Sequence, residues 1–153
     1  MKKFLWIPVA FLLSSCAGTP RDDAYFLSIQ DVLESSEAQK NLIGDIRFYF
    51  AGQPHPDVEE TLEQGHSIYK RARALRRDRT ESIEKNDELG CNRSMLTILR
   101  IFQARARKAG GNAVINIENH YKESTFRSTD TFECHVGAGG ARVILKGDIV
   151  KLK

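Results

Sequence analysis

Residues 91–111 constrain the fold more than any other part of the sequence. Their apolar positions recur every three or four residues, which is the spacing of an amphipathic helix with one apolar face. Basic residues gather near the end of the segment, where the helix macrodipole is negative, and Gly110-Gly111 can supply a C-cap. The sequence therefore predicts one long helix at about residues 93–109. Its apolar positions are Met95, Ile98, Leu99, Phe102, Ala106 and Ala109.

Alternating apolar residues predict strands on both sides of this helix. Turns are predicted at residues 52–56, which hold two prolines, and at residues 137–140, which are all small. Strands around a single long helix indicate an α+β fold, in which the helix covers one face of a small antiparallel-rich sheet. The predicted strands are residues 45–50 (with Ile46, Phe48 and Phe50 on one side), 112–121 (Ala113, Ile115 and Ile117), 131–136 (Phe132, Cys134 and Val136) and 142–152 (with a bulge at Gly147).

Residues 57–80 allow two interpretations. Acidic residues come first and basic residues later, the order that suits a helix macrodipole, but Gly65 interrupts the segment and residues 66–72 alternate as a strand does. Residues 78–90 are polar and predict an exposed loop. Farther upstream, Ser35 is placed to cap a short helix that ends at Gly44.

The first 16 residues have the pattern of a bacterial lipoprotein leader. A basic start is followed by an apolar run that is shorter than the roughly 20 residues needed to cross a bilayer, and the run ends in Leu13-Ser14-Ser15-Cys16. We expect cleavage before Cys16, which removes 15 of 153 residues and leaves 138, and acylation of the cysteine with diacylglycerol and palmitate. Ala17 replaces the aspartate that commonly retains lipoproteins in the inner membrane, so the outer membrane facing the periplasm is expected. The predicted organisation is leader 1–15, lipidated N-terminus and tether 16–27, and one domain at 28–153.

Processing leaves two cysteines, Cys91 and Cys134, in an oxidising compartment, which favours a disulfide between them. The closed loop of about 44 residues is worth roughly 4 kcal/mol of stability. Buried free thiols and a catalytic cysteine are the alternatives. Cys134 adjoins His135, but neighbours on a strand point to opposite faces and cannot act together as nucleophile and base.

No nucleotide-binding or hydrolase motif occurs, so we expect no cofactor and no enzymatic activity. The processed chain is nearly neutral, which disfavours nucleic acid as a partner. The alternative hypothesis is a metal-binding or enzymatic module built from His120 and His135 with nearby carboxylates, of which Glu118, Glu133 and Asp148 are the candidates.

Six basic residues within residues 70–79 form the densest charge feature. Anionic lipid, lipopolysaccharide or an acidic envelope protein could bind there. The alternative is a solvated segment neutralised by the acidic residues of positions 81–88. The basic residues are Lys70, Arg71, Arg73, Arg76, Arg77 and Arg79.

Three motifs carry a family resemblance: Cys91-x-x-Ser94, R-K-A-G-G-N-A-V-I-N-I at residues 107–117, and F-E-C-H-V-G-A at residues 132–138. They resemble small, mostly uncharacterised proteobacterial envelope proteins that often carry the label of an excinuclease ATPase subunit, and the RcsF-type and YbjQ-type α+β domain. The chain lacks the motifs that the excinuclease label requires. RcsF-type domains carry four cysteines in two bridges, where this processed chain has one possible pair. The resemblance implies the fold, a strand at residues 66–72 and a non-enzymatic envelope role, such as sensing of envelope stress.

Overall fold

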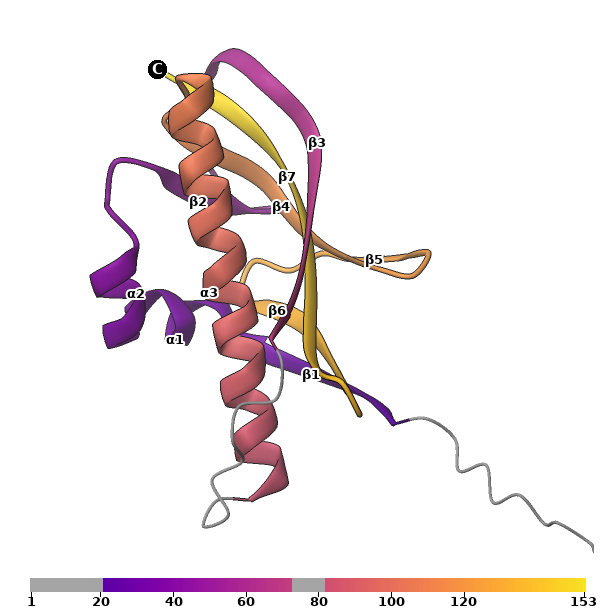
Figure 1. The fold of residues 1–153 in the computed structure, drawn as a ribbon. Helices are drawn as coiled ribbons and strands as arrows, with labels where there is room; N and C mark the ends of the chain where they lie inside the picture. Colours follow the sequence, from indigo (N-terminus) through magenta and orange to yellow (C-terminus); the bar gives the residue numbers. More distant parts are fainter. Residues whose placement is uncertain (1–20, 73–81) are drawn as a thin grey trace, which may run out of the picture.

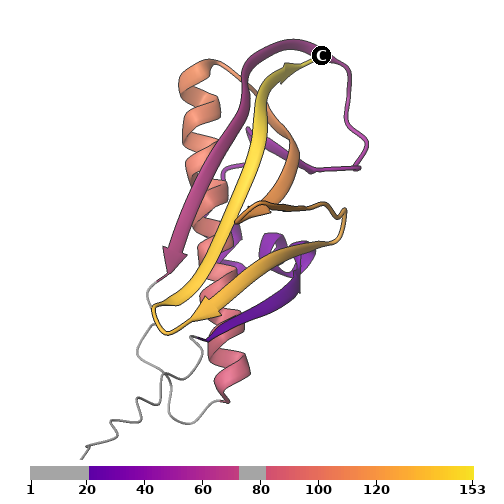
Figure 2. The same ribbon diagram turned by 90° about the vertical axis from the view of Figure 1, so that its right-hand side faces the viewer.

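The computed structural model describes residues 21–72 and 82–153. A curled, mainly antiparallel sheet forms a half-barrel around one side of a single long helix, so the predicted α+β fold class is confirmed (Figures 1 and 2). In chain order the elements are β1 (Asp22–Ser28), α1 (Ile29–Glu34), α2 (Ser36–Asn41), β2 (Arg47–Phe50), β3 (Val58–Ala72), α3 (Ile83–Ala109), β4 (Ala113–Tyr121), β5 (Ser124–Phe126), β6 (Thr131–Gly137) and β7 (Gly140–Leu152).

The sheet is organised around β7. One edge of β7 pairs with β3 from Leu152 back to Ala141, and the other edge pairs with β6 near the start of β7 and with β4 toward its end. β1 extends the sheet beyond β6, β5 folds back on β4, and β2 lies beside β4. Only the β2–β4 pairing is parallel among the strands described.

The apolar face of α3 packs against the concave side of the sheet, and this contact forms the main core. Alternate residues of β6 and β7 point toward the helix, as the period of a strand requires. The predicted grouping of Phe132, Cys134 and Val136 is confirmed, since all three are buried in this core. Its largest fully buried side chains on α3 and β7 are Met95, Ile98, Leu99, Phe102, Val143, Leu145 and Ile149.

α3 is longer than the sequence predicts, because it begins at Ile83 and not near residue 93. Residues 83–90 were expected to form an exposed loop, and that prediction is wrong. The Ser82 hydroxyl caps the helix by accepting a hydrogen bond from the backbone N–H of Lys85 at 3.2 Å. Gly90 lies within the helix, where a Cβ atom would stand 3.1 Å from the Cβ of Ala141, so glycine permits the close approach of α3 to β7.

Of the two interpretations of residues 57–80, the strand is confirmed over Val58–Ala72 and the helix is wrong there. Gly65 adopts the left-handed conformation (φ 62°) at a bulge in this strand, which explains why it does not fit a helix.

The N-terminal part of the domain begins earlier than the sequence predicts. Residues 22–27, which the sequence predicts as part of the tether, form β1 together with Ser28 and pair with β6. Ser35 caps a short helix as predicted, because its hydroxyl accepts from the backbone N–H of Ala38 at 3.1 Å. That helix, α2, ends at Asn41 with Leu42 as its C-cap, and not at Gly44.

The alternation predicted for β4 fails at one residue. Asn116 has a positive φ of 53° and marks an extra residue relative to β7. The bulge reverses the faces that follow, so Ile117 packs under α3 with Val114. Ala113 and Ile115 instead pack with Val150, Leu152 and Tyr49 in a small second core on the opposite side of the sheet.

Candidate functional site

The face of the sheet opposite α3, here called the outer face, carries a hollow of about 520 Å³. Leu145 and Ile149 of β7 point into the core, so Lys146 and Asp148 lie on the outer face. The floor of the hollow is formed where β3 and β4, the two neighbours of β7, both bulge at the same point along β7. The lining residues are Ala51, Gly52, Gln64, Gly65, Asn116, Glu118, Arg127, Lys146, Gly147 and Asp148.

Asp148 joins the two bulges. One carboxylate oxygen accepts from the backbone N–H of Gly65 on β3 at 2.6 Å, and the other accepts from the side-chain amide of Asn116 on β4 at 2.8 Å. The prediction of a bulge at Gly147 within the last strand is wrong, because the extra residues lie opposite this part of β7, in β3 and β4.

The other charges of the hollow are arranged differently. Arg127 donates to Glu118 at 2.6 Å, and the Glu118 side chain is only 12% exposed. Lys146 has no carboxylate within ion-pair distance among the described residues. A polar ligand could therefore meet a free ammonium group beside a paired glutamate.

A second group of polar side chains lies nearer the start of β7 and is called the His135 cluster. It consists of Asp22, Tyr121, Glu133, His135 and Arg142. The His135 ring stacks on Tyr121 at 3.5 Å between centroids and is 9% exposed. Nε2 of His135 lies 3.0 Å from Glu133, and Nδ1 lies 3.5 Å from Asp22.

Asp22 is the hydrogen-bonding centre of the His135 cluster. Tyr121 donates to its carboxylate at 2.9 Å, Lys122 at 3.0 Å and Arg142 at 3.1 Å. Partial burial by itself raises the pKa of Asp22, but the hydrogen bonds from Lys122 and Tyr121 outweigh it and the net pKa is lowered. Burial and the hydrogen bond to Asp22 raise the pKa of Tyr121.

Three buried polar atoms of the His135 cluster have no hydrogen-bond partner in the described part of the chain. They are Nδ1 of His135, Oε2 of Glu133 and Nε of Arg142. Buried polar atoms in folded proteins are almost always paired with protein or ordered water.

The structure scatters the residues of the predicted metal or enzymatic module. His135 and Glu133 lie together, but Glu118 and Asp148 line the hollow, and His120 lies 3.2 Å from the hydroxyl of Thr125. Because Tyr121 faces His135, its strand neighbour His120 points the other way. Among the side chains that the structure describes, no three histidine, cysteine or carboxylate groups could hold a metal ion.

The predicted disulfide between Cys91 and Cys134 is confirmed. It links α3 to β6, and both cysteines are 0% exposed. The alternatives of free buried thiols and of a catalytic cysteine are therefore wrong for this pair.

Most of the remaining predicted site residues lie outside residues 21–72 and 82–153, which the structure describes. Cys16 lies outside the described residues, as do Arg73, Arg76, Arg77 and Arg79 of the basic segment. Lys70 and Arg71 belong to the end of β3, pairing with Val143 and Arg142, and their side chains are not described.

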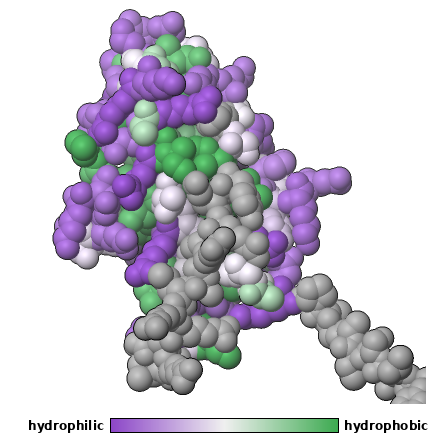
Figure 3. Space-filling view, in the orientation of Figure 1, coloured by the Kyte–Doolittle hydropathy of each residue, from purple (hydrophilic) through white to green (hydrophobic). Residues whose placement is uncertain are grey.

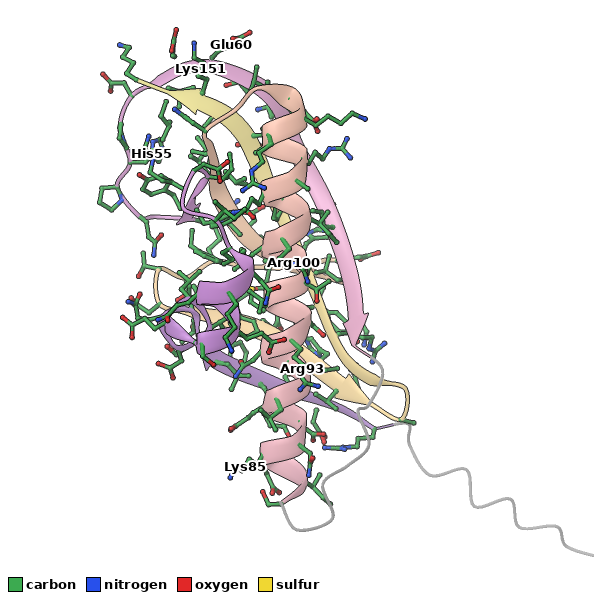
Figure 4. All side chains as sticks on the ribbon, turned by 60° about the vertical axis from the view of Figure 1, so that its left-hand side comes forward. His55, Glu60, Lys85, Arg93, Arg100 and Lys151 are labelled. Carbon is green, nitrogen blue, oxygen red and sulfur yellow. A yellow bond between two sulfur atoms is a disulfide. The ribbon has the colours of Figure 1, made fainter. Side chains whose placement is uncertain are left out.

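A further positive surface runs along α3. Figure 4 shows Lys85, Arg93 and Arg100 on the exposed side of the helix, and Lys108 near the end of the helix is also exposed. No described carboxylate lies within ion-pair distance of Arg93, Arg100 or Lys108.

Sequence reasoning missed Asp22, Tyr121 and Arg142. Asp22 lies in the predicted tether. Tyr121 reaches His135 on β6 only because β4 stops pairing with β7 after Asn119, near the end of β4. Asn119 fixes that branch point, since its amide donates to the carbonyl of Glu133 at 2.8 Å and accepts from the Glu133 N–H at 2.9 Å. No local signal reveals such contacts.

Comparison with known proteins finds no protein family, curated protein or solved structure that matches this chain. None of the helices in the described part of the chain has the length and apolar composition needed to cross a membrane.

Proposed function

We propose that this chain is a lipid-anchored protein of the bacterial cell envelope that works by binding a partner and not by catalysis. The observation that carries the proposal is the buried disulfide between Cys91 and Cys134, because stable disulfides belong to proteins of oxidising compartments. The leader at residues 1–15 supplies the export route, and Cys16, which directly follows it, supplies the anchor. Ala17 favours the outer membrane, with the domain facing the periplasm.

The arrangement of polar side chains supports binding. The ring of His135 is held by stacking and by carboxylates on two sides, and its neighbour Cys134 is in the disulfide. The outer face and the exposed side of α3 instead offer charged groups at fixed positions. A relationship to RcsF-type and YbjQ-type domains remains part of the proposal, since it rests on the motifs at residues 107–117 and 132–138, and it favours a role in envelope sensing.

The proposed partners are an acidic envelope protein, anionic lipid or lipopolysaccharide. Their attraction is assigned to the basic residues of positions 70–79, and positively charged segments near a membrane bind anionic headgroups with about 1 kcal/mol per basic residue.

Metabolic labelling with a clickable fatty acid tests the anchor. The wild-type chain should be labelled and recovered with membranes, whereas Cys16→Ala should be unlabelled. Cys91→Ala is the matched control, because it removes a cysteine outside the leader and should leave labelling intact. Equal labelling of wild type and Cys16→Ala would show that the chain is not a lipoprotein.

A further inference from the structure

The start of β1 and the start of α3 lie together at one end of the molecule. Arg21 forms ion pairs with Asp23 and with Asp87, a buried residue of α3, and the Tyr25 hydroxyl donates to the same Asp87 carboxylate at 3.0 Å. The first residue of β1, Asp22, pairs with Gly137 at the turn between β6 and β7. Figures 1 and 2 show these elements at one end and the C-terminus at the other.

The anchor must lie close to this end. Only residues 17–21 separate Cys16 from β1, and five residues span at most about 18 Å when fully extended. Because Arg21 is tied to α3 through Asp87, the first turns of α3 cannot move far from the point where the chain leaves the membrane.

Apolar side chains are exposed at the same end of the molecule. Ile83 is 52% exposed and Leu89 is 47% exposed, and both lie in the first seven residues of α3. Figure 3 shows a mostly hydrophilic surface on which one of the apolar areas lies at this lower end. Single exposed apolar residues are common on protein surfaces, so their position beside the tether is what matters.

We propose that the N-terminal end of α3 rests on the bilayer that holds the anchor, with Ile83 and Leu89 inserted at the boundary between the headgroups and the acyl chains. This inference rests on the proposed acylation of Cys16. α3 has 27 residues and therefore extends about 40 Å from the membrane. The hollow and the C-terminal end then face away from the lipid.

The contact is apolar and not electrostatic. Glu84 and Glu88 flank Lys85 on the exposed surface of these turns, so the first turns of α3 carry no net positive charge of their own. Their contact with the bilayer should therefore form on zwitterionic phosphatidylcholine, separately from any attraction between anionic lipid and the basic segment.

Tryptophan reporters test this orientation. The one tryptophan of the sequence, Trp6, lies in the leader, so the processed chain has none. Acylated Leu89→Trp protein would be reconstituted into phosphatidylcholine vesicles with bromine-labelled acyl chains, which quench tryptophan on contact. Val58→Trp is the matched control, because Val58 is also an exposed apolar residue but pairs with Leu152 at the opposite end. Ile83→Trp provides a second reporter.

The Leu89 and Ile83 reporters should lose most of their emission and shift to the blue, while the Val58 reporter should be unaffected. Equal quenching at both ends, or no quenching at residues 83 and 89 in protein that floats with the vesicles, would overturn the inference. Flotation of wild type and its loss in Cys16→Ala report separately on the anchor, so failure of the proposed function is distinguishable from failure of the orientation.

Discussion

Asp148 shows how a single side chain shapes the outer face of the sheet. The strands on either side of β7, β3 and β4, both bulge beside Asp148. The Gly65 N–H of β3 donates to one oxygen of its carboxylate, and the Asn116 side-chain amide of β4 donates to the other. A bulge leaves backbone groups without the hydrogen bonds that they would make in a regular sheet. The Asp148 carboxylate accepts hydrogen bonds from both bulges and so replaces part of that lost hydrogen bonding.

We predict that Asp148→Ala lowers the free energy of unfolding by about 1.5–3 kcal/mol, the usual value for a hydrogen bond to a charged group. Asp148→Asn should cost less, because its remaining oxygen can still accept from Gly65 while its NH2 group opposes that of Asn116. Urea unfolding measures both values, with Asp57→Ala as the control, since the Asp57 side chain is 84% exposed. Equal stability of all three variants would show that Asp148 does not hold the bulges.

Asp22 makes the stability of the His135 cluster depend on pH. Because its pKa is lower in the folded chain than in the unfolded chain, the charged form stabilises the fold. This contribution is fully present above the unfolded pKa of about 3.9 and is lost as the pH falls through the lower folded value.

Asp22→Asn should therefore reduce stability at neutral pH and have little effect at the acid end of the titration. Unfolding by urea at a series of pH values between neutrality and acid gives the difference between wild type and variant. Asp31→Asn, on an exposed turn of α1, is the control. A constant difference between wild type and Asp22→Asn across the series would contradict the prediction.

At the scale of elements, α3 and the disulfide hold the two sides of the fold together. The bond joins Cys91 on α3 to Cys134 on β6 across 43 positions of sequence. It lies at the close approach of helix and sheet that Gly90 permits, so it fixes the helix against the strands at the end where β1 begins.

We predict that Cys91→Ser with Cys134→Ser lowers the free energy of unfolding by about 2–5 kcal/mol, as is typical when a native disulfide is removed. Wild-type protein purified without reductant should show no free thiol at these positions in denaturant, and the double variant should retain the sheet and helix signals of circular dichroism. Two reactive thiols in the unreduced wild type would refute the bridge in the native protein.

The elements that sequence could predict are those whose local pattern agrees with their packing. The helical spacing from Met95 to Ala106 and the alternation in β6 and β7 both match the observed core. The first turns of α3 could not be predicted, because their anchoring contact is the distant Arg21–Asp87 pair. The faces of β4 were predicted wrongly because one residue, Asn116, reverses the alternation.

The candidate site shows the same limit at the scale of side chains. His135 and Glu133 could be placed together from their spacing on one strand, since residues two apart share a face. Their partners Asp22 and Tyr121 come from strands more than ten residues away in sequence, and the stacking of Tyr121 depends on the branch that Asn119 holds.

At the scale of the whole molecule, positive charge occurs in two separate places. One is the basic segment at residues 70–79, which begins within the last residues of β3 and precedes α3 in the sequence. The other is the exposed side of α3. Two triple variants to glutamine separate them: a segment variant (Arg73, Arg76 and Arg77) and a helix variant (Arg93, Arg100 and Lys108).

If the basic segment recruits anionic lipid or an acidic partner, the segment variant should bind vesicles containing phosphatidylglycerol more weakly by about 3 kcal/mol, from about 1 kcal/mol per basic residue. This is on the order of a hundredfold in affinity. Added salt should reduce wild-type binding, because exposed charges are screened within about 8 Å at physiological ionic strength. The thermal stability of both variants should remain within about 0.5 kcal/mol of wild type, as is usual for surface substitutions.

The helix variant is the control, because it loses the same charge as the segment variant and should keep its binding. Equal loss in both variants would assign binding to net charge, unfolding of the segment variant would make its arginines structural, and unchanged binding would leave the segment simply solvated.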